Sequence, residues 1–235
     1  MKIISNIAHQ NDAMTPELSP SQPFLTHILH AMSPELMADM PGLYAQLQQW
    51  SGQWVALTPM QCIASHNDIM ISQIGIQPAQ IDESKLLANN VCEQFFDVFS
   101  EIRVLDEYVW LAQLTKPFAA IAQAPWTLQG RSLGAYLHAS DALQWVQCFT
   151  ELQMFLASQP NASSMCNALW CWGMSEHEAS YDQSIFCDNA DMNHVLATRY
   201  GTTFSTTFDD ACLCIIDTPA DYADVDAIQQ LSWRP

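Results

Sequence analysis

A helical pattern followed by a tryptophan-rich strand constrains this chain more than any other feature. Between residues 141 and 157, apolar residues recur at steps of three and four, which places them on one face of an α-helix: Ala142, Val146, Phe149, Leu152 and Leu156. In the next apolar segment Trp170 and Trp172 are two positions apart, so in a strand they share a face. The sequence therefore predicts a helix packed against a strand rich in tryptophan.

One polar residue interrupts the apolar stripe of this helix. Gln153 lies four residues after Phe149 and three before Leu156. A buried amide without a partner costs about 1–3 kcal/mol, so we expect Asn167 to hydrogen-bond with it. Together with Glu151 and the two tryptophans, these amides form a predicted centre for a small ligand or a partner's peptide, and Arg131 is the best-placed basic residue. The alternative is that the same residues only hold the helix on the sheet.

The rest of the chain alternates between strand-like and helical patterns. Strands are expected at 54–57 and 62–65, on either side of a break at Pro59, and at 69–72, 108–112, 184–187 and 211–216. The last of these is a continuous apolar run, as expected of a central strand covered on both faces. Helices are expected from Ser33-Pro34-Glu35 to just before Pro41 and over residues 43–50, and further helices are expected to start at Asp82 and Thr218. These patterns predict a mixed α/β sandwich with a sheet of about five or six strands.

The ends of the chain and its cysteines suggest where it works. Residues 5–23 are rich in Asn, Gln, Ser and Pro, which predicts a flexible leader over 1–23 and a single α/β domain over 24–235. The start lacks the apolar core of a signal peptide, and no window has 18 continuous apolar residues. The eight cysteines are scattered through apolar segments. We therefore expect a cytoplasmic bacterial protein with reduced thiols.

Charge excludes several classes of partner. The 235 residues carry 25 acidic side chains against seven basic ones, for a net charge of −18. Nucleic acids and anionic membranes require clustered lysine and arginine, so neither is an expected partner. An acidic subunit that engages a basic partner remains open. The sequence leaves the oligomeric state undetermined.

Metal-ligand residues occur, but without a strong motif. Asp188, Asp191 and His194 recur at a spacing of three and could converge on one helical face. Asp217 follows an apolar strand, where α/β enzymes often keep a carboxylate, and Asp68 lies at a turn. The sequence has no glycine-rich phosphate loop and no HExxH. We therefore assign no catalytic residue and expect no cofactor, and we keep a metal-dependent phosphatase or phosphomutase as the alternative hypothesis.

Several motifs follow one another in a fixed order between about residues 54 and 175. They are Pro59 with Asp68, Trp110-Leu111, Gly130-Arg131, Asp141-Ala142, Trp145, the run of Glu151, Gln153 and Met154, and the run of Asn167, Leu169, Trp170, Trp172 and Gly173. In these motifs the segment resembles the RpfE-type regulatory protein family of bacteria, which is often automatically named phosphoglycerate mutase. The family's histidines are replaced here by Gln61, Ala157 and Gln159. The resemblance implies a regulatory protein without evident catalytic machinery, and this is our first functional hypothesis.

Overall fold

The computed structural model describes residues 2–5, 34–65, 68–117, 123–137, 143–159, 165–173, 184–187, 189–201, 203–204 and 213–216. The chain forms two compact units. One joins Met1–Ser51 to His177–Pro235, and we call it the terminal unit; the other, Gly52–Glu176, is the central unit. The division into a leader over 1–23 and one domain over 24–235 stays a prediction, because most of the leader lies outside the described residues.

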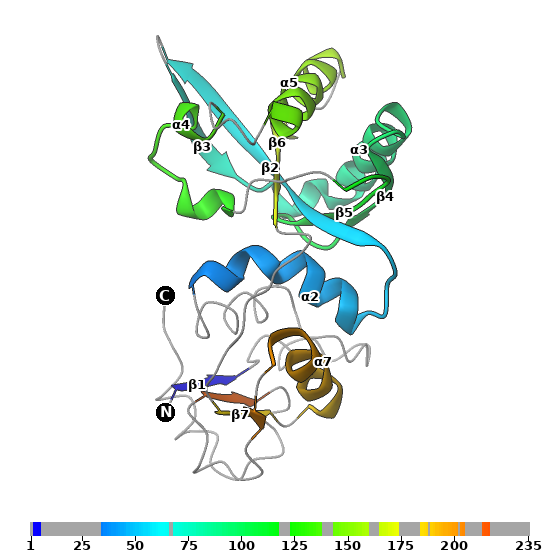
Figure 1. Ribbon diagram of the computed structural model, residues 1–235. Helices are drawn as coiled ribbons and strands as arrows, with labels where there is room; N and C mark the ends of the chain where they lie inside the picture. Colours follow the sequence, from blue (N-terminus) through cyan, green and yellow to red (C-terminus); the bar gives the residue numbers. More distant parts are fainter. Residues whose placement is uncertain are drawn as a thin grey trace. The chain divides into compact units, whose positions relative to one another are not determined.

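The central unit is built on an antiparallel sheet of five strands (Figure 1). Its strands are β2 (Gln53–Ser65), β3 (Asp68–Ile74), β4 (Phe99–Val104), β5 (Trp110–Leu114) and β6 (Ala168–Trp172). The order is β3-β2-β5-β4, and β6 also pairs with β2. The predicted mixed α/β fold with a sheet of about five strands is confirmed.

The sequence predicted a break between two strands at Pro59, but this residue lies inside β2. Proline lacks an N–H and is tolerated in a strand only where no partner needs that donor. β5 pairs with β2 as far as Leu57, and β3 pairs with it from Met60 onward. Pro59 falls between these two ladders, and its carbonyl oxygen accepts a hydrogen bond from Gly75 N at 2.8 Å. The two strands predicted around Pro59 are therefore one strand of 13 residues.

Two long helices accompany this sheet, α3 (Ile81–Gln94) and α5 (Leu143–Ser158). α3 begins two residues earlier than predicted, with Gln80 rather than Asp82 as its N-cap, and Leu86 is 65% exposed. The two helices meet through Phe95 and Phe155, whose ring centroids are 5.7 Å apart at 88°. Shorter helical segments are η3 (Pro78–Gln80), η4 (Pro125–Thr127) and α4 (Gly134–Leu137).

α5 packs on β6 much as the helical pattern predicts. Its buried side chains are Trp145, Cys148, Phe149, Leu152 and Leu156. The Trp145 ring stacks on Phe149 and meets Trp170 of β6 at a centroid distance of 4.6 Å. Val146 is only half-buried, and Ala142 lies outside the described residues. The interior of the central unit is thus largely aromatic.

The terminal unit has a parallel sheet with the order β1-β9-β7-β8. The strands are β1 (Lys2–Ser5), β7 (Ser184–Cys187), β8 (Thr203–Phe204) and β9 (Leu213–Ile216). β9 pairs with a strand on each side, as the predicted central strand at 211–216 should. The helix predicted from Thr218 onward lies outside the described residues.

The terminal unit has two helical segments close to those predicted on either side of Pro41. A 3₁₀ segment, η2 (Pro34–Asp39), ends before Pro41 as predicted, but it leads directly into α2 (Met40–Leu47), which begins three residues earlier than the helix predicted at 43–50 and includes Pro41. Proline suits the first turn of a helix because the N–H there has no intrahelical partner. The second helix, α7 (Ala190–Tyr200), is capped by the Asn189 side chain and ends at Gly201, whose φ of 62° is left-handed. Within the described residues, no helix is both long and apolar enough to cross a membrane.

Candidate functional site

The two tryptophans of the predicted binding centre are fully buried. The Trp170 indole N–H donates to the carbonyl oxygen of Gln123 at 3.0 Å, and the Trp172 indole N–H donates to Thr58 Oγ1 at 2.9 Å. The Trp172 ring also meets Trp126 edge to face, with centroids 5.1 Å apart. Both indole rings are covered by protein, and both indole N–H groups have an acceptor in the protein. This geometry favours a role of the two tryptophans in packing.

The sequence predicted a hydrogen bond between Asn167 and Gln153, but Asn167 binds other atoms in the structure. Its Oδ1 accepts from Cys62 N at 2.7 Å, and its Nδ2 donates to Cys62 O at 2.8 Å. Its own backbone N–H donates to Met60 O at 3.1 Å. The side chain thus extends the pairing of β6 with β2 to the residue before the start of β6. Sequence spacing could not reveal this, because Asn167 and Cys62 are 105 residues apart.

The other predicted binding residues lie on two different parts of the central unit. Glu151 is exposed on α5, Gln153 is half-buried on the same helix, and Arg131 is exposed just before α4. Among the described residues, no hydrogen bond or ion pair joins these three to one another or to Asn167. A ligand-binding role for this set of residues stays a prediction.

The predicted metal site is only partly described. Asp191 and His194 are exposed on α7, one turn apart, and Asp188 lies outside the described residues. No group of three or more His, Cys, Asp or Glu in the described part of the chain is arranged to hold a metal ion. The metal site that includes Asp188 therefore also stays a prediction.

Asp68 holds a loop of the central unit against β3. Its Oδ1 accepts from Ser132 Oγ at 2.6 Å, from Ile69 N at 2.8 Å and from Gly134 N at 3.4 Å. The Ser132 hydrogen bond is the main reason that the pKa of Asp68 is lowered. These bonds favour the ionised carboxylate and give it a structural role at the start of β3.

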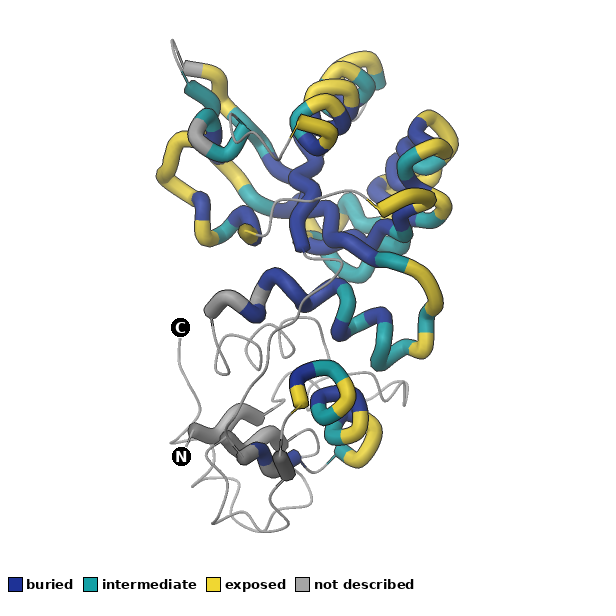
Figure 2. Tube along the Cα trace, in the orientation of Figure 1, coloured by how far each residue is buried: buried dark blue, intermediate teal, exposed yellow. Residues whose placement is uncertain are grey.

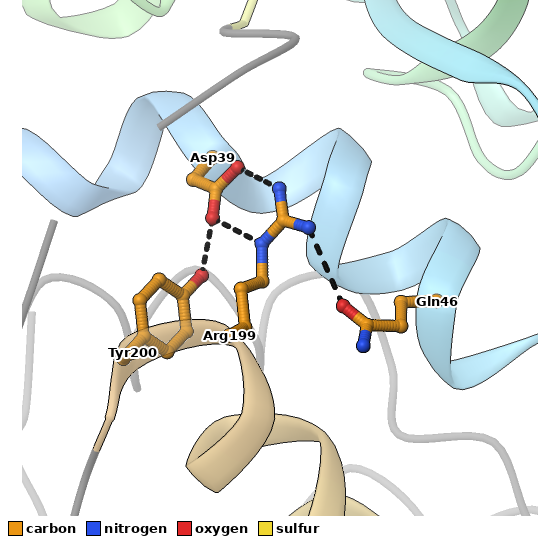
Figure 3. Close-up of polar contacts among 4 residues, drawn as sticks. All are labelled: Asp39, Gln46, Arg199 and Tyr200. Atoms are coloured by element: carbon orange, nitrogen blue, oxygen red, sulfur yellow. Dashed lines mark hydrogen bonds and ion pairs between the residues drawn. The ribbon is translucent and has the colours of Figure 1, made fainter. Parts of the chain in front are cut away.

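The terminal unit contains a buried ionic cluster that the sequence did not indicate (Figure 3). Asp39, at the end of η2, is completely buried, and both its oxygens bind the guanidinium of Arg199 on α7. Tyr200 OH donates to Asp39 Oδ2 at 2.6 Å, and Arg199 Nη1 donates to Gln46 Oε1 at 3.3 Å. A possible signal in the sequence is the scarcity of cations, since Arg199 is one of only seven basic residues.

Electrostatics fix the protonation states of this cluster. Burial opposes the charge of Arg199, but the hydrogen bonds and charge of Asp39 outweigh it, so the pKa of Arg199 is raised. Burial, followed by the charge of Asp39, raises the pKa of Tyr200, so its hydroxyl keeps its proton. Arg199 therefore stays a cation and Tyr200 a neutral donor, and both bind the carboxyl group of Asp39. This arrangement ties the start of α2 to the end of α7.

Exposed apolar side chains distinguish the surface of the central unit. Figure 2 shows exposed residues along the outer sides of α3 and α5. Among the described residues, every large hydrophobic side chain that is exposed belongs to this unit: Ile63, Met70, Leu86, Phe96, Tyr108, Leu143 and Met154. Single exposed apolar residues are common, but four of these seven lie on or beside α3 and α5.

Comparison with known proteins gives one structural similarity. No family model matches the chain, and no curated protein matches it. A cofactor-independent phosphoglycerate mutase from Thermoplasma acidophilum DSM 1728 aligns over 93% of this chain and 68% of its own, with 8% sequence identity and a TM-score of 0.36. At this level of similarity, neither a shared fold nor a shared activity follows.

Proposed function

We propose that the chain is a non-catalytic regulatory protein that binds a partner protein through the surface of its central unit. The observation that carries this proposal is the concentration of exposed large apolar side chains on that unit among the described residues. Apolar surface left in water is a common mark of protein interaction sites.

The polar groups of the central unit support the same conclusion. Asn167 binds backbone atoms of β2, Asp68 binds the loop before α4, and the Trp172 indole binds Thr58. Each of these three groups is used to hold the fold together. The interior of the unit therefore acts as a rigid support, which leaves its outer surface for recognition.

A photo-crosslinking amino acid placed on the surface tests this proposal. We would introduce it at Ile63, Tyr108 or Leu143 of the central unit, and at the exposed Thr198 of the terminal unit as a matched control. Irradiation in the cells of origin should join the central unit, but not Thr198, to one protein that mass spectrometry identifies and that binds again when purified. If no central-unit position forms such an adduct, the proposal is wrong.

A second candidate, a metal-dependent enzyme acting on phosphate groups, is favoured by one observation. β7 ends at Cys187 and β9 ends at Ile216, and the two strands are parallel neighbours whose register pairs Cys187 with Ile215. Asp188 and Asp217 come directly after them in the sequence and lie outside the described residues. Ligands of parallel α/β sheets bind beyond the carboxyl ends of the strands, so these two carboxylates would hold a divalent ion.

Calorimetric titration with Mn²⁺ separates this candidate from the first. Binding that is lost in both Asp188→Asn and Asp217→Asn, with an unchanged circular dichroism spectrum, would support the enzyme. Equal heats for the wild type and both variants would reject it.

A further inference from the structure

Two exposed side chains flank the contact between α3 and α5. Phe95, at the end of α3, meets Phe155 of α5 edge to face. Phe96 directly follows Phe95, and Met154 directly precedes Phe155. The Phe96 side chain is 73% exposed and Met154 is 69% exposed, the two highest values among the described large hydrophobic residues. The junction of the two helices therefore presents a phenylalanine and a methionine to solvent.

Two carboxylates belong to the same junction. Asp97 directly follows Phe96, and Glu151 lies one turn before Met154 on α5. Burial is the main cause that raises the pKa of the Cys148 thiol to about 12, and the negative charges of Glu151 and Asp97 raise it further. The two carboxylates come from different elements, and each lies within four residues of Phe95 or Phe155, whose rings are in contact. We call Phe96, Asp97, Glu151 and Met154 the junction patch.

Basic residues do not neutralise the junction patch. The described ion pairs of the central unit are Lys85 with Asp82 and Arg103 with Glu101, so neither patch carboxylate takes part in one. The central unit as a whole has eleven acidic residues against four basic ones. The patch is thus apolar at two points and negative at two others.

This combination of charges selects the chemistry of the partner. A second copy of the chain also carries a net charge of −18, so pairing two copies here would bring like charges together. A nucleic acid or an anionic membrane would be repelled in the same way. A basic protein segment is attracted. Methionine and phenylalanine are enriched at protein interfaces, and a flexible methionine adapts to the shape of an incoming apolar side chain.

We propose that the junction patch binds a basic amphipathic helix of a partner protein. Phe96 and Met154 contact the apolar stripe of that helix, and Asp97 and Glu151 bind the lysine or arginine side chains beside the stripe. An amphipathic helix presents both kinds of side chain on adjacent strips of one surface, which matches the patch. This inference rests on the proposed function and adds the location of the binding surface and the class of partner.

The test uses the full chain and a designed, fluorescently labelled helix with one leucine stripe bordered by lysines. Fluorescence anisotropy should show binding that weakens with added salt. A scrambled peptide of the same composition has no apolar stripe, so its affinity should be lower by about tenfold or more. The Phe96→Ser/Met154→Ser double variant should also lose about tenfold or more in affinity, as expected when two anchors are truncated.

The matched control is Thr198→Ser, which changes an exposed side chain of α7 outside the central unit. It should bind the designed helix as the wild type does, and circular dichroism should show that all variants are folded. The inference is overturned if the Phe96→Ser/Met154→Ser variant binds the designed helix as tightly as the wild type does. It is also overturned if the wild type binds the ordered and the scrambled peptide equally well. If crosslinking at Ile63 still captures a partner, the proposed function survives that failure; if crosslinking also fails, both are wrong.

Discussion

The two units solve the problem of a stable interior in different ways. In the central unit, α5 and β6 bury large aromatic rings, and the indole N–H groups of Trp145, Trp170 and Trp172 donate to protein oxygens. In the described part of the terminal unit, α2 and α7 are joined by a fully buried carboxylate and an arginine. One interior is mostly apolar, whereas the other depends on an ion pair.

This difference has energetic consequences. Apolar burial contributes about 25 cal/mol per Å² and is spread over many contacts. A buried ion pair adds little net stability, because removing both charges from water is costly, but losing one partner leaves the other charge unpaired. The terminal unit should therefore be sensitive at one residue, and the central unit should lose stability in smaller steps.

Removing the buried carboxylate should have the largest effect. Asp39→Ala leaves Arg199 without a counter-charge and Tyr200 OH without its acceptor. We expect a loss of about 3–5 kcal/mol in the free energy of unfolding. Hydrogen exchange followed by mass spectrometry should place the loss of protection in α2 and α7. Equal loss in α3 and α5 would contradict separate stabilisation of the two units.

Two further variants control this experiment. Asp82→Ala breaks a surface ion pair with Lys85 and should change stability far less. Gly42→Ala would ordinarily stabilise a helix, but a Cβ at this position would overlap the guanidinium of Arg199. It should therefore destabilise the terminal unit even though it removes no charged group. A stabilised Gly42→Ala variant would show that Arg199 can move without cost.

An intermediate effect is expected at Thr58 in the central unit. Thr58→Val keeps the shape of the side chain but removes the oxygen that accepts the Trp172 indole N–H. Leaving this buried donor unpaired should cost about 1–3 kcal/mol, measured by urea denaturation. Thr58→Ser keeps the hydroxyl and should lose less. If the serine variant is the less stable of the two, packing of the methyl group outweighs the hydrogen bond.

A pH-dependent effect is expected from the buried thiols of the central unit. Burial raises the pKa of the Cys62 thiol from 9.0 to about 11 and that of Cys166 to about 12. The unfolded thiols ionise first, so their contribution to stability is complete below about pH 9. It falls as the pH rises through the folded values, by at most about 1.4 kcal/mol per pH unit for each thiol. Thermal unfolding between pH 8 and 11 should show this decline.

Cys166→Ala isolates the contribution of one thiol. Tyrosine and lysine also titrate in this range, so the informative quantity is the difference in slope between the variant and the wild type. The variant should lose stability less steeply above pH 9. Identical slopes would mean that the Cys166 thiol ionises as easily in the folded protein as in the unfolded one.

Local patterns predicted a considerable part of this structure. The apolar spacing after residue 142 placed Phe149, Leu152 and Leu156 on the buried face of α5. The alternation of patterns predicted a mixed α/β fold, and the run before Ile216 predicted a strand paired on both sides. These features are readable because helix and strand periods act over a few residues, within which the burial of a side chain follows from its neighbours in the sequence.

The sequence by itself thus determined the mixed α/β class, most of the buried face of α5 and the acidic charge that limits the possible partners. Only the tertiary structure decided that Asn167 binds Cys62 and that Asp39 meets Arg199, 160 residues away. It also decided that Pro59 lies inside a strand, because two partner strands leave a gap there. Each of these outcomes depends on which distant elements meet, and periodicity along the chain carries no information about that choice.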